Sequence, residues 1–266
     1  MCSLGERRDS VRGQFVFGTG VRRGIMFVGE GPGKIEESVG EPFVGPAGKL
    51  LKTILKALNF TDVYFTNLVT CRSCEPVMDP ETGLPRMIKR KRGHDEVMLQ
   101  DQPPLPSQIE ACRQRLHEEI YIVDPVLIVS VGGTATEALF GKPIAITKEH
   151  GQPREVVIPG ATLRPVLTDK KQIWGHKIRG EYQMPTEPNE VRYLVMPILH
   201  PAFVLRKGAD LGKKSPLRLL TTDLRLAVKI YERYLVEALG VEPTSTSDAD
   251  LTEVEEDNGF EHEDSP

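Results

Sequence analysis

The sequence of 266 residues has no apolar run of 18 residues, the length that a membrane-spanning helix needs. Its first residues show no secretory signal, and it has only four cysteines. These absences exclude a membrane span and predict an intracellular, cytoplasmic protein, a setting in which disulfides are rare. A chain of this length can still bury one sizeable core.

Basic residues are absent from the end of the chain. Residues 240–266 hold ten Asp or Glu and no Lys or Arg. They are otherwise rich in Ser and Thr, with too few apolar residues to offset the cost of ordering, so we expect a disordered acidic tail after a domain spanning 1–239. The rest of the chain carries 34 basic against 28 acidic residues. This balance suits a polyanionic partner, although many proteins without one have a similar balance.

The chain is organised around residues 24–51, which read GIMFVGEGPGKIEESVGEPFVGPAGKLL. The apolar run 25–28 predicts a buried strand. Gly29, Gly31 and Gly33 follow it, and three glycines in five residues let the backbone turn sharply and approach a ligand closely. Pro46 and the apolar residues after it predict a helix that begins with proline in its first turn.

The glycine-rich loop lacks the two common nucleotide-binding patterns. A P-loop needs four residues between its glycines, followed by Lys and Ser or Thr, whereas Gly29 and Gly33 are separated by three residues and Ile35 follows Lys34. A dinucleotide fingerprint needs a third glycine at the position that Lys34 occupies. An ordinary strand-to-helix turn accounts for the glycines but not for the aromatic ring of Phe43.

Strand and helix patterns alternate along the rest of the chain. They predict strands near 63–66, 126–131 and 193–196, and helices near 107–122 and 217–239, with a short helix between them that follows Gly132-Gly133 and ends at Gly141. They also predict a long polar loop at 75–106 and an irregular insertion with short strands at 142–190. Such alternation predicts an α/β fold, a three-layer sandwich with a central, mainly parallel sheet flanked by helices. Because ligands bind beyond the carboxyl ends of such strands, the residues that follow them, among them Asn67 and His200, are expected at one site.

Three segments resemble uracil-DNA glycosylases of the family-4, iron-sulfur type. GEGPG followed by EPFVGPAGKLL resembles the paired motif of that family, and VYFTNLVTCR (63–72) and MPILHPAFVLR (196–206) match it in the same order. The resemblance covers roughly residues 2–235. It implies a hydrolase of DNA base-excision repair, which flips uracil out of DNA and hydrolyses its N-glycosidic bond to leave an abasic site. We expect a monomer.

The residues of these motifs suit that chemistry. Phe43 can stack on an extruded base for ~1–3 kcal/mol, and Asn67 offers both a donor and an acceptor for the O4 and N3–H of uracil. His200 can donate an N–H to the charge that develops on O2, and Glu30 can stabilise the cationic sugar or position the attacking water. Gly29, Gly31 and Gly33 complete the expected substrate site. Three of these residues also have a purely structural interpretation. Phe43 could be a core residue, Asn67 a turn residue, and His200 with Pro201 the start of a helix.

The four cysteines are candidate metal ligands, because an intracellular chain rarely keeps disulfides. The resemblance implies that Cys71 and Cys112 are ligands and that Cys2 matches the second cysteine of an N-terminal C-x-x-C pair. The first cysteine of that pair is absent, and Cys74 is the obvious substitute. Four thiolates suit a [4Fe-4S] cluster; zinc is the alternative, and free thiols are the third reading.

Other functional readings stay open at this point. The basic run Lys89–His94 suggests a solvated face or contact with phosphates, and a sugar-trapping histidine occurs in a related branch of the superfamily. The protein could also bind uracil-containing DNA without cutting it, or recruit a partner through its acidic tail.

Overall fold

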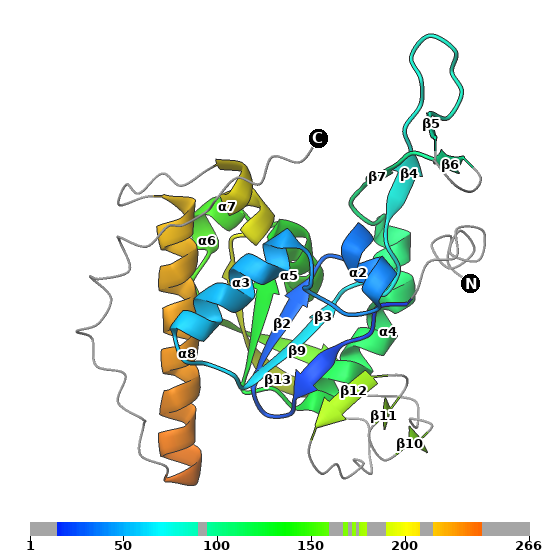
Figure 1. Ribbon diagram of the computed structural model, residues 1–266. Helices are drawn as coiled ribbons and strands as arrows, with labels where there is room; N and C mark the ends of the chain where they lie inside the picture. The colour runs from blue at the N-terminus through cyan, green and yellow to red at the C-terminus, as the bar shows by residue number, and fades with distance from the viewer. Residues whose placement is uncertain are drawn as a thin grey trace. The chain divides into compact units, whose positions relative to one another are not determined.

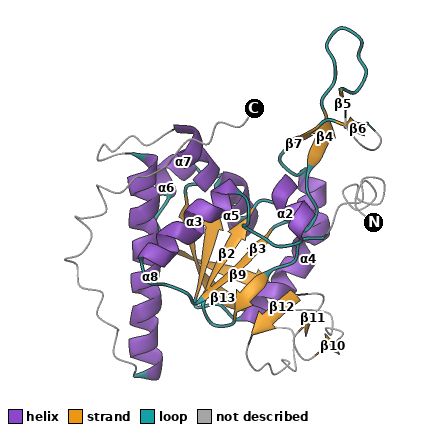
Figure 2. Cartoon of the chain, viewed as in Figure 1, coloured by secondary structure: helices purple, strands orange, loops and turns teal. Residues whose placement is uncertain are grey.

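The computed structural model contains a compact unit that ends at Tyr231, and a second unit begins at Glu232. The residues that the structure describes are 15–89, 95–159, 167–169, 172–173, 176–179, 190–207 and 215–240 (Figures 1 and 2). Within these ranges, no helix combines the length and the apolar character needed to cross a membrane. Cys2, most of the Lys89–His94 run and the acidic tail beyond Gly240 lie outside them.

A nine-stranded sheet forms the centre of the first unit in the described part of the chain. Its four middle strands run parallel, in the spatial order β3 (Val63–Asn67), β2 (Ile25–Gly29), β8 (Leu127–Val131) and β13 (Glu190–Ile198). The outer strands are β1 (Thr19–Val21), β9 (Arg154–Pro159), β10 (Leu167–Asp169), β11 (Gln172–Ile173) and β12 (His176–Arg179). β1 and β9 pair antiparallel with β3 and β13. The four middle strands are all parallel, which agrees with the mainly parallel sheet that the sequence predicts.

Prolines and glycines mark several helix ends. Pro46 and Pro106 lie in the first turns of two helices, where a missing N–H costs nothing, and Gly141, with φ 66°, ends another. The helices are α2 (Lys34–Val39), α3 (Pro46–Ala57), α4 (Pro106–Val123), α5 (Gly133–Phe140), α6 (Ile146–Glu149), α7 (Pro201–Lys207) and α8 (Pro216–Leu239).

Helices cover both faces of the sheet. Successive residues of a strand point to opposite faces. Met26 and Val28 of β2 belong to an apolar cluster that includes residues of α4 and α5. On the other face, Phe27 stacks on Phe65 of β3, and Lys52 of α3 lies over the Phe65 ring. Figure 2 shows the parallel strands between these helices, which confirms the three-layer α/β arrangement.

Two stretches differ from the sequence prediction. The described residues of 75–106 are not a simple loop: β4 (Cys74–Pro76) pairs with β7 (Leu99–Asp101), and β5 (Met87–Ile88) pairs with β6 (Glu96–Val97), and these paired strands are called the ribbon. Strands of two or three mostly exposed residues leave no alternation in the sequence.

The stretch 142–190 likewise contributes to the main sheet. β9 pairs with β13 from Arg154 to Pro159, so it is an edge strand of the main sheet, whereas β10, β11 and β12 are short strands of the kind that the sequence analysis expects in this stretch. β13 itself is longer than the predicted strand 193–196 because this pairing extends it toward the N-terminal side.

Burial of the inner face of α3 is expected to contribute strongly to stability. Leu51 is fully buried, whereas Leu226 of α8 is 38% exposed. Leu51→Ala should lower the free energy of unfolding by about 2–5 kcal/mol, because it leaves a cavity in a packed layer. The matched change Leu226→Ala should cost less than about 1 kcal/mol. Urea denaturation monitored by circular dichroism measures both, and equal losses would show that α3 is not packed as described.

Candidate active site

The parallel register brings three predicted site segments to one edge of the sheet. Gly29, the last residue of β2, lies opposite Asn67, the last residue of β3. β13 ends at Ile198, opposite Val131 of β8, and His200 follows two residues later. A cavity of about 360 Å³ opens at this edge. All seven predicted catalytic and substrate-binding residues line it, namely Gly29, Glu30, Gly31, Gly33, Phe43, Asn67 and His200.

Phe43 is held in an unusual backbone conformation at the wall of the cavity. Its φ is +56°, in the left-handed region that a non-glycine residue occupies at a cost of about 1–3 kcal/mol. Its ring lies 5.2 Å from that of Phe65, which in turn stacks on Phe27 at 5.3 Å. A Cβ at Gly48 of α3 would come within 2.3 Å of the Phe43 backbone, so glycine there permits the close approach. The aromatic surface is therefore fixed by packing.

Gly29 leaves room for the side-chain amide of Asn67 and the ring of Phe43 to lie beside the same backbone position. A Cβ added at this position would lie 2.3 Å from Asn67 Oδ1 and 2.9 Å from Phe43 Cζ. Asn67 is buried, with 4% of its surface exposed. The amide and the aromatic ring can approach each other only because Gly29 has no side chain. A flat ligand on the ring of Phe43 would have a donor and an acceptor at its edge.

His200 is arranged as a neutral donor. Its Nδ1 accepts a hydrogen bond from the Ala202 backbone N–H at 3.1 Å, which leaves the ring proton on Nε2. Burial, and secondarily the positive charge of Arg206, lower the pKa of His200 below the usual histidine value. A Cβ at Gly132, whose φ is +89°, would lie 3.1 Å from the Cβ and Cδ2 atoms of His200, so the imidazole packs directly on the turn after β8.

Two acidic residues that the sequence analysis missed also line the cavity. Glu36 of α2 accepts the backbone N–H of Gly45 at 2.8 Å and so connects α2 to the start of α3. Asp101 accepts a hydrogen bond of 2.6 Å from the buried Arg72, whose guanidinium also pairs with Glu37. Sequence periodicity gives no signal for such contacts, because they depend on which polar side chains meet in three dimensions.

The cysteines are only partly brought together. Cys71 is buried in the apolar cluster beneath α4, and Cys112 of α4 packs against the same cluster. Cys74 is buried at the start of β4, and Cys2 lies outside the described residues. Among the residues that the structure describes, no three Cys, His, Asp or Glu side chains converge as a metal site requires. The packing of Cys71 and Cys112 on one apolar cluster is compatible with a shared thiolate ligand set.

The state of His200 can be measured directly. We expect its pKa to lie below the ordinary histidine value of about 6.5, and its neutral form to carry the proton on Nε2. Titration of the ring resonances by NMR, with ¹⁵N shifts to assign the tautomer, measures both. Arg206→Met should raise the pKa only partway, because burial is the larger cause. A pKa at or above 6.5 in the unmodified chain would contradict the described burial of the ring.

Comparison with known proteins identifies the family of this chain. Residues 17–225 match the uracil DNA glycosylase superfamily. The chain is 31% identical over 189 residues to the Type-4 uracil-DNA glycosylase of Thermotoga maritima, an alignment that covers 69% of this chain and 79% of that protein. It is 28% identical over 212 residues to the Type-4 uracil-DNA glycosylase of Archaeoglobus fulgidus, covering 72% and 79%.

A third relative is the Type-4 uracil-DNA glycosylase of Sulfurisphaera tokodaii, which is 30% identical over 188 residues, covering 68% of this chain and 60% of that one. The expectation drawn from the three sequence motifs is therefore confirmed: this chain belongs to the uracil-DNA glycosylase superfamily and, within it, to the Type-4 family.

Proposed function

We propose that this protein removes uracil from DNA by hydrolysing the N-glycosidic bond, leaving an abasic site. The observation that carries the proposal is the convergence of Gly29, Phe43, Asn67 and His200 on one cavity of about 360 Å³. This volume falls in the range of pockets that hold small molecules, and a single extruded base is of that class. The names of the Type-4 relatives agree with this activity.

The base enters the cavity with its face against Phe43 and its edge toward Asn67. Stacking on the ring contributes ~1–3 kcal/mol and does not depend on which base is bound. Selectivity comes from the amide of Asn67, which accepts from N3–H of uracil and donates to O4. A cytosine presents the reverse pattern at these two atoms, so its polar groups would be left unpaired in a buried site.

His200 stabilises the departing base. As the glycosidic bond breaks, the bonding electron pair stays with uracil, and negative charge develops on O2. The Nε2–H of a neutral imidazole donates to that oxygen without having to give up its proton. The lowered pKa keeps the ring neutral at physiological pH, and the fixed Ala202 contact sets its orientation before the substrate arrives.

Glu30 acts on the sugar that is left behind. It follows β2 directly, lines the cavity and is only partly buried. A carboxylate here can stabilise the cationic sugar or orient the water that attacks its anomeric carbon. Gly31 and Gly33 leave space at this part of the cavity wall that a side chain would fill. A Cβ at Gly31 would approach Val69, and one at Gly33 would approach the carboxylate of Glu36.

We further propose that residues 1–239 form the glycosylase domain and that 240–266 form an acidic tail outside it. The domain works as a monomer in the cytoplasm on uracil-containing DNA. The residue balance of 34 basic against 28 acidic before the tail supports a polyanionic substrate.

The proposed cofactor is one [4Fe-4S] cluster held by Cys2, Cys71, Cys74 and Cys112, with zinc as the alternative. The support is the donor chemistry of four thiols and the packing of Cys71 and Cys112 in one cluster of the core. When bound, the cluster would cross-link the N-terminal segment to α4 and would transfer no electrons in the reaction.

The role of His200 is tested with a uracil-containing oligonucleotide under single-turnover conditions. His200→Ala should lower the rate constant by roughly 10²–10³-fold, because one donor aimed at developing charge contributes ~2.7–4 kcal/mol, while DNA binding changes little. His117→Ala is the matched control, since His117 lies in α4 and does not line the cavity. A normal rate in His200→Ala would show that the assignment is wrong.

The cysteine assignment is tested by metal analysis of protein purified without oxygen. The unmodified chain should contain about four irons, and Cys71→Ser or Cys112→Ser should lose them and lower the melting temperature. Cys74→Ser distinguishes the fourth ligand: full iron content in this variant would mean that Cys74 is not a ligand. One tightly bound zinc in place of iron would favour the alternative metal.

A further inference from the structure

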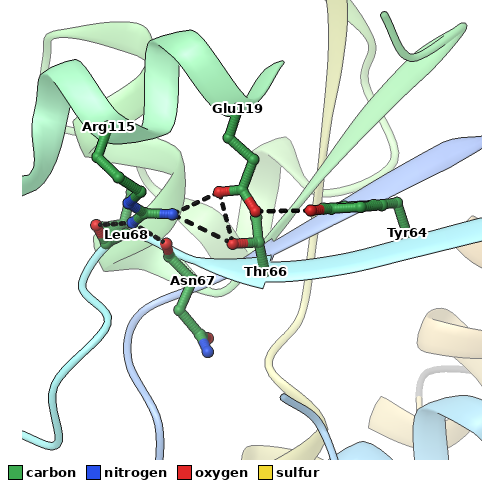
Figure 3. Close-up of polar contacts among 6 residues, drawn as sticks. All are labelled: Tyr64, Thr66, Asn67, Leu68, Arg115 and Glu119. Carbon is green, nitrogen blue, oxygen red and sulfur yellow. Dashed lines mark hydrogen bonds and ion pairs between the residues drawn. The ribbon is translucent and has the colours of Figure 1, made fainter. Parts of the chain in front are cut away.

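A polar network holds Asn67 from the side opposite the cavity (Figure 3). The guanidinium of Arg115 in α4 donates through Nη2 to the backbone carbonyls of Asn67 and Leu68, both at 2.7 Å. Its Nη1 donates to Thr66 Oγ1 at 3.3 Å and pairs with the carboxylate of Glu119. One side chain therefore binds three consecutive residues at the end of β3.

These bonds support a part of the strand that one neighbouring strand does not reach. β1 pairs with β3 only as far as Phe65, so Asn67 and Leu68 lie beyond its end. A strand end with fewer ladder bonds has more freedom to tilt. The planar guanidinium binds both carbonyl oxygens through the two N–H groups of Nη2 while its Nη1 binds Thr66 and Glu119, and a single ammonium could not serve all four partners at once.

Glu119 fixes the guanidinium in its turn. Its side chain is fully buried. The Tyr64 hydroxyl donates to Oε1 and the Thr66 hydroxyl to Oε2, both at 2.9 Å. Burial, and secondarily Glu119 itself, raise the pKa of Tyr64 well above its usual value, so this phenol stays a donor at neutral pH. A Cβ at Gly18 would lie 2.0 Å from Glu119 Oε1, so glycine is needed to leave room for the carboxylate.

The network is not by itself evidence of a gain in stability. Within the part of the chain that the structure describes, the buried Nε of Arg115 has no hydrogen-bond partner. An unpaired buried N–H on a charged group is unfavourable, and a buried ion pair is weak evidence of net stabilisation. What the guanidinium does achieve is to fix the backbone immediately after the Asn67 side chain, through the carbonyls of Asn67 and Leu68, and to bind the side chain of Thr66 just before it.

We propose that Arg115 is a positioning residue that sets the angle at which the Asn67 amide faces the cavity. Figure 3 shows that amide directed away from Arg115, so Arg115 acts only through the backbone of the strand end. The inference rests on the proposed role of Asn67 in reading the base. A displacement of about 1 Å at such a group can cost on the order of 10²-fold in rate.

The test is a double-mutant cycle on the full chain, measured by single-turnover excision of uracil and by inhibition with free uracil. Arg115→Met should lower the rate and weaken uracil inhibition by about 10–100-fold, while affinity for an abasic-site oligonucleotide stays unchanged. Combined with Asn67→Ala, it should add nothing further, because both changes remove the same interaction. Arg113→Met, on the same helix in an exposed pair with Glu110, is the matched control and should behave as the unmodified chain.

Each outcome decides one assignment. If Arg115→Met has a normal rate while Asn67→Ala is slow, the positioning role is wrong and the base-reading role stands. If Asn67→Ala is itself normal, both are wrong. Effects that multiply in the double variant would also overturn the proposal. Should Arg115→Met fail to fold, Arg115→Lys carries the same cycle, since it keeps the charge but has one nitrogen where the guanidinium uses two, so it cannot bind the carbonyls together with Thr66 and Glu119.

Discussion

The parallel, in-register pairing of β2 with β3 is the constraint on which the site depends. It sets Gly29 opposite Asn67, and the extension of the same register through β8 to β13 brings His200 to the same edge. Parallel strands need helices on both faces, so α3 and α4 are required by the sheet and also provide the walls and supports of the cavity. Fold and site are therefore consequences of one pairing scheme.

The cavity combines a rigid aromatic wall with polar groups whose bonds are largely made before any substrate binds. The rings of Phe27, Phe65 and Phe43 form a layered support, and His200 has its tautomer set by a backbone N–H. Preorganised groups of this kind need little rearrangement as charge develops, which is where electrostatic catalysis gains most of its effect.

Much of this arrangement could be predicted from the sequence. Apolar runs and flanking glycines identify β2 and β8, and the motifs around Gly29, Asn67 and His200 identify the cavity residues. The ribbon at 75–106, the edge strand β9 and the roles of Glu36 and Arg115 could not be predicted in this way. Short paired strands carry no period, and an arginine on a helix gives no sign that it faces inward until the partner carbonyls are placed.

The contact between Gly132 and His200 ties together two positions far apart in the chain. A side chain at 132 would have to adopt a left-handed backbone and would also press on the imidazole. The two positions are therefore coupled: a side chain at 132 requires a strained backbone there and a small shift of the imidazole. The same contact limits any redesign of the cavity for a bulkier base, because residue 132 beneath the imidazole cannot be replaced without moving His200.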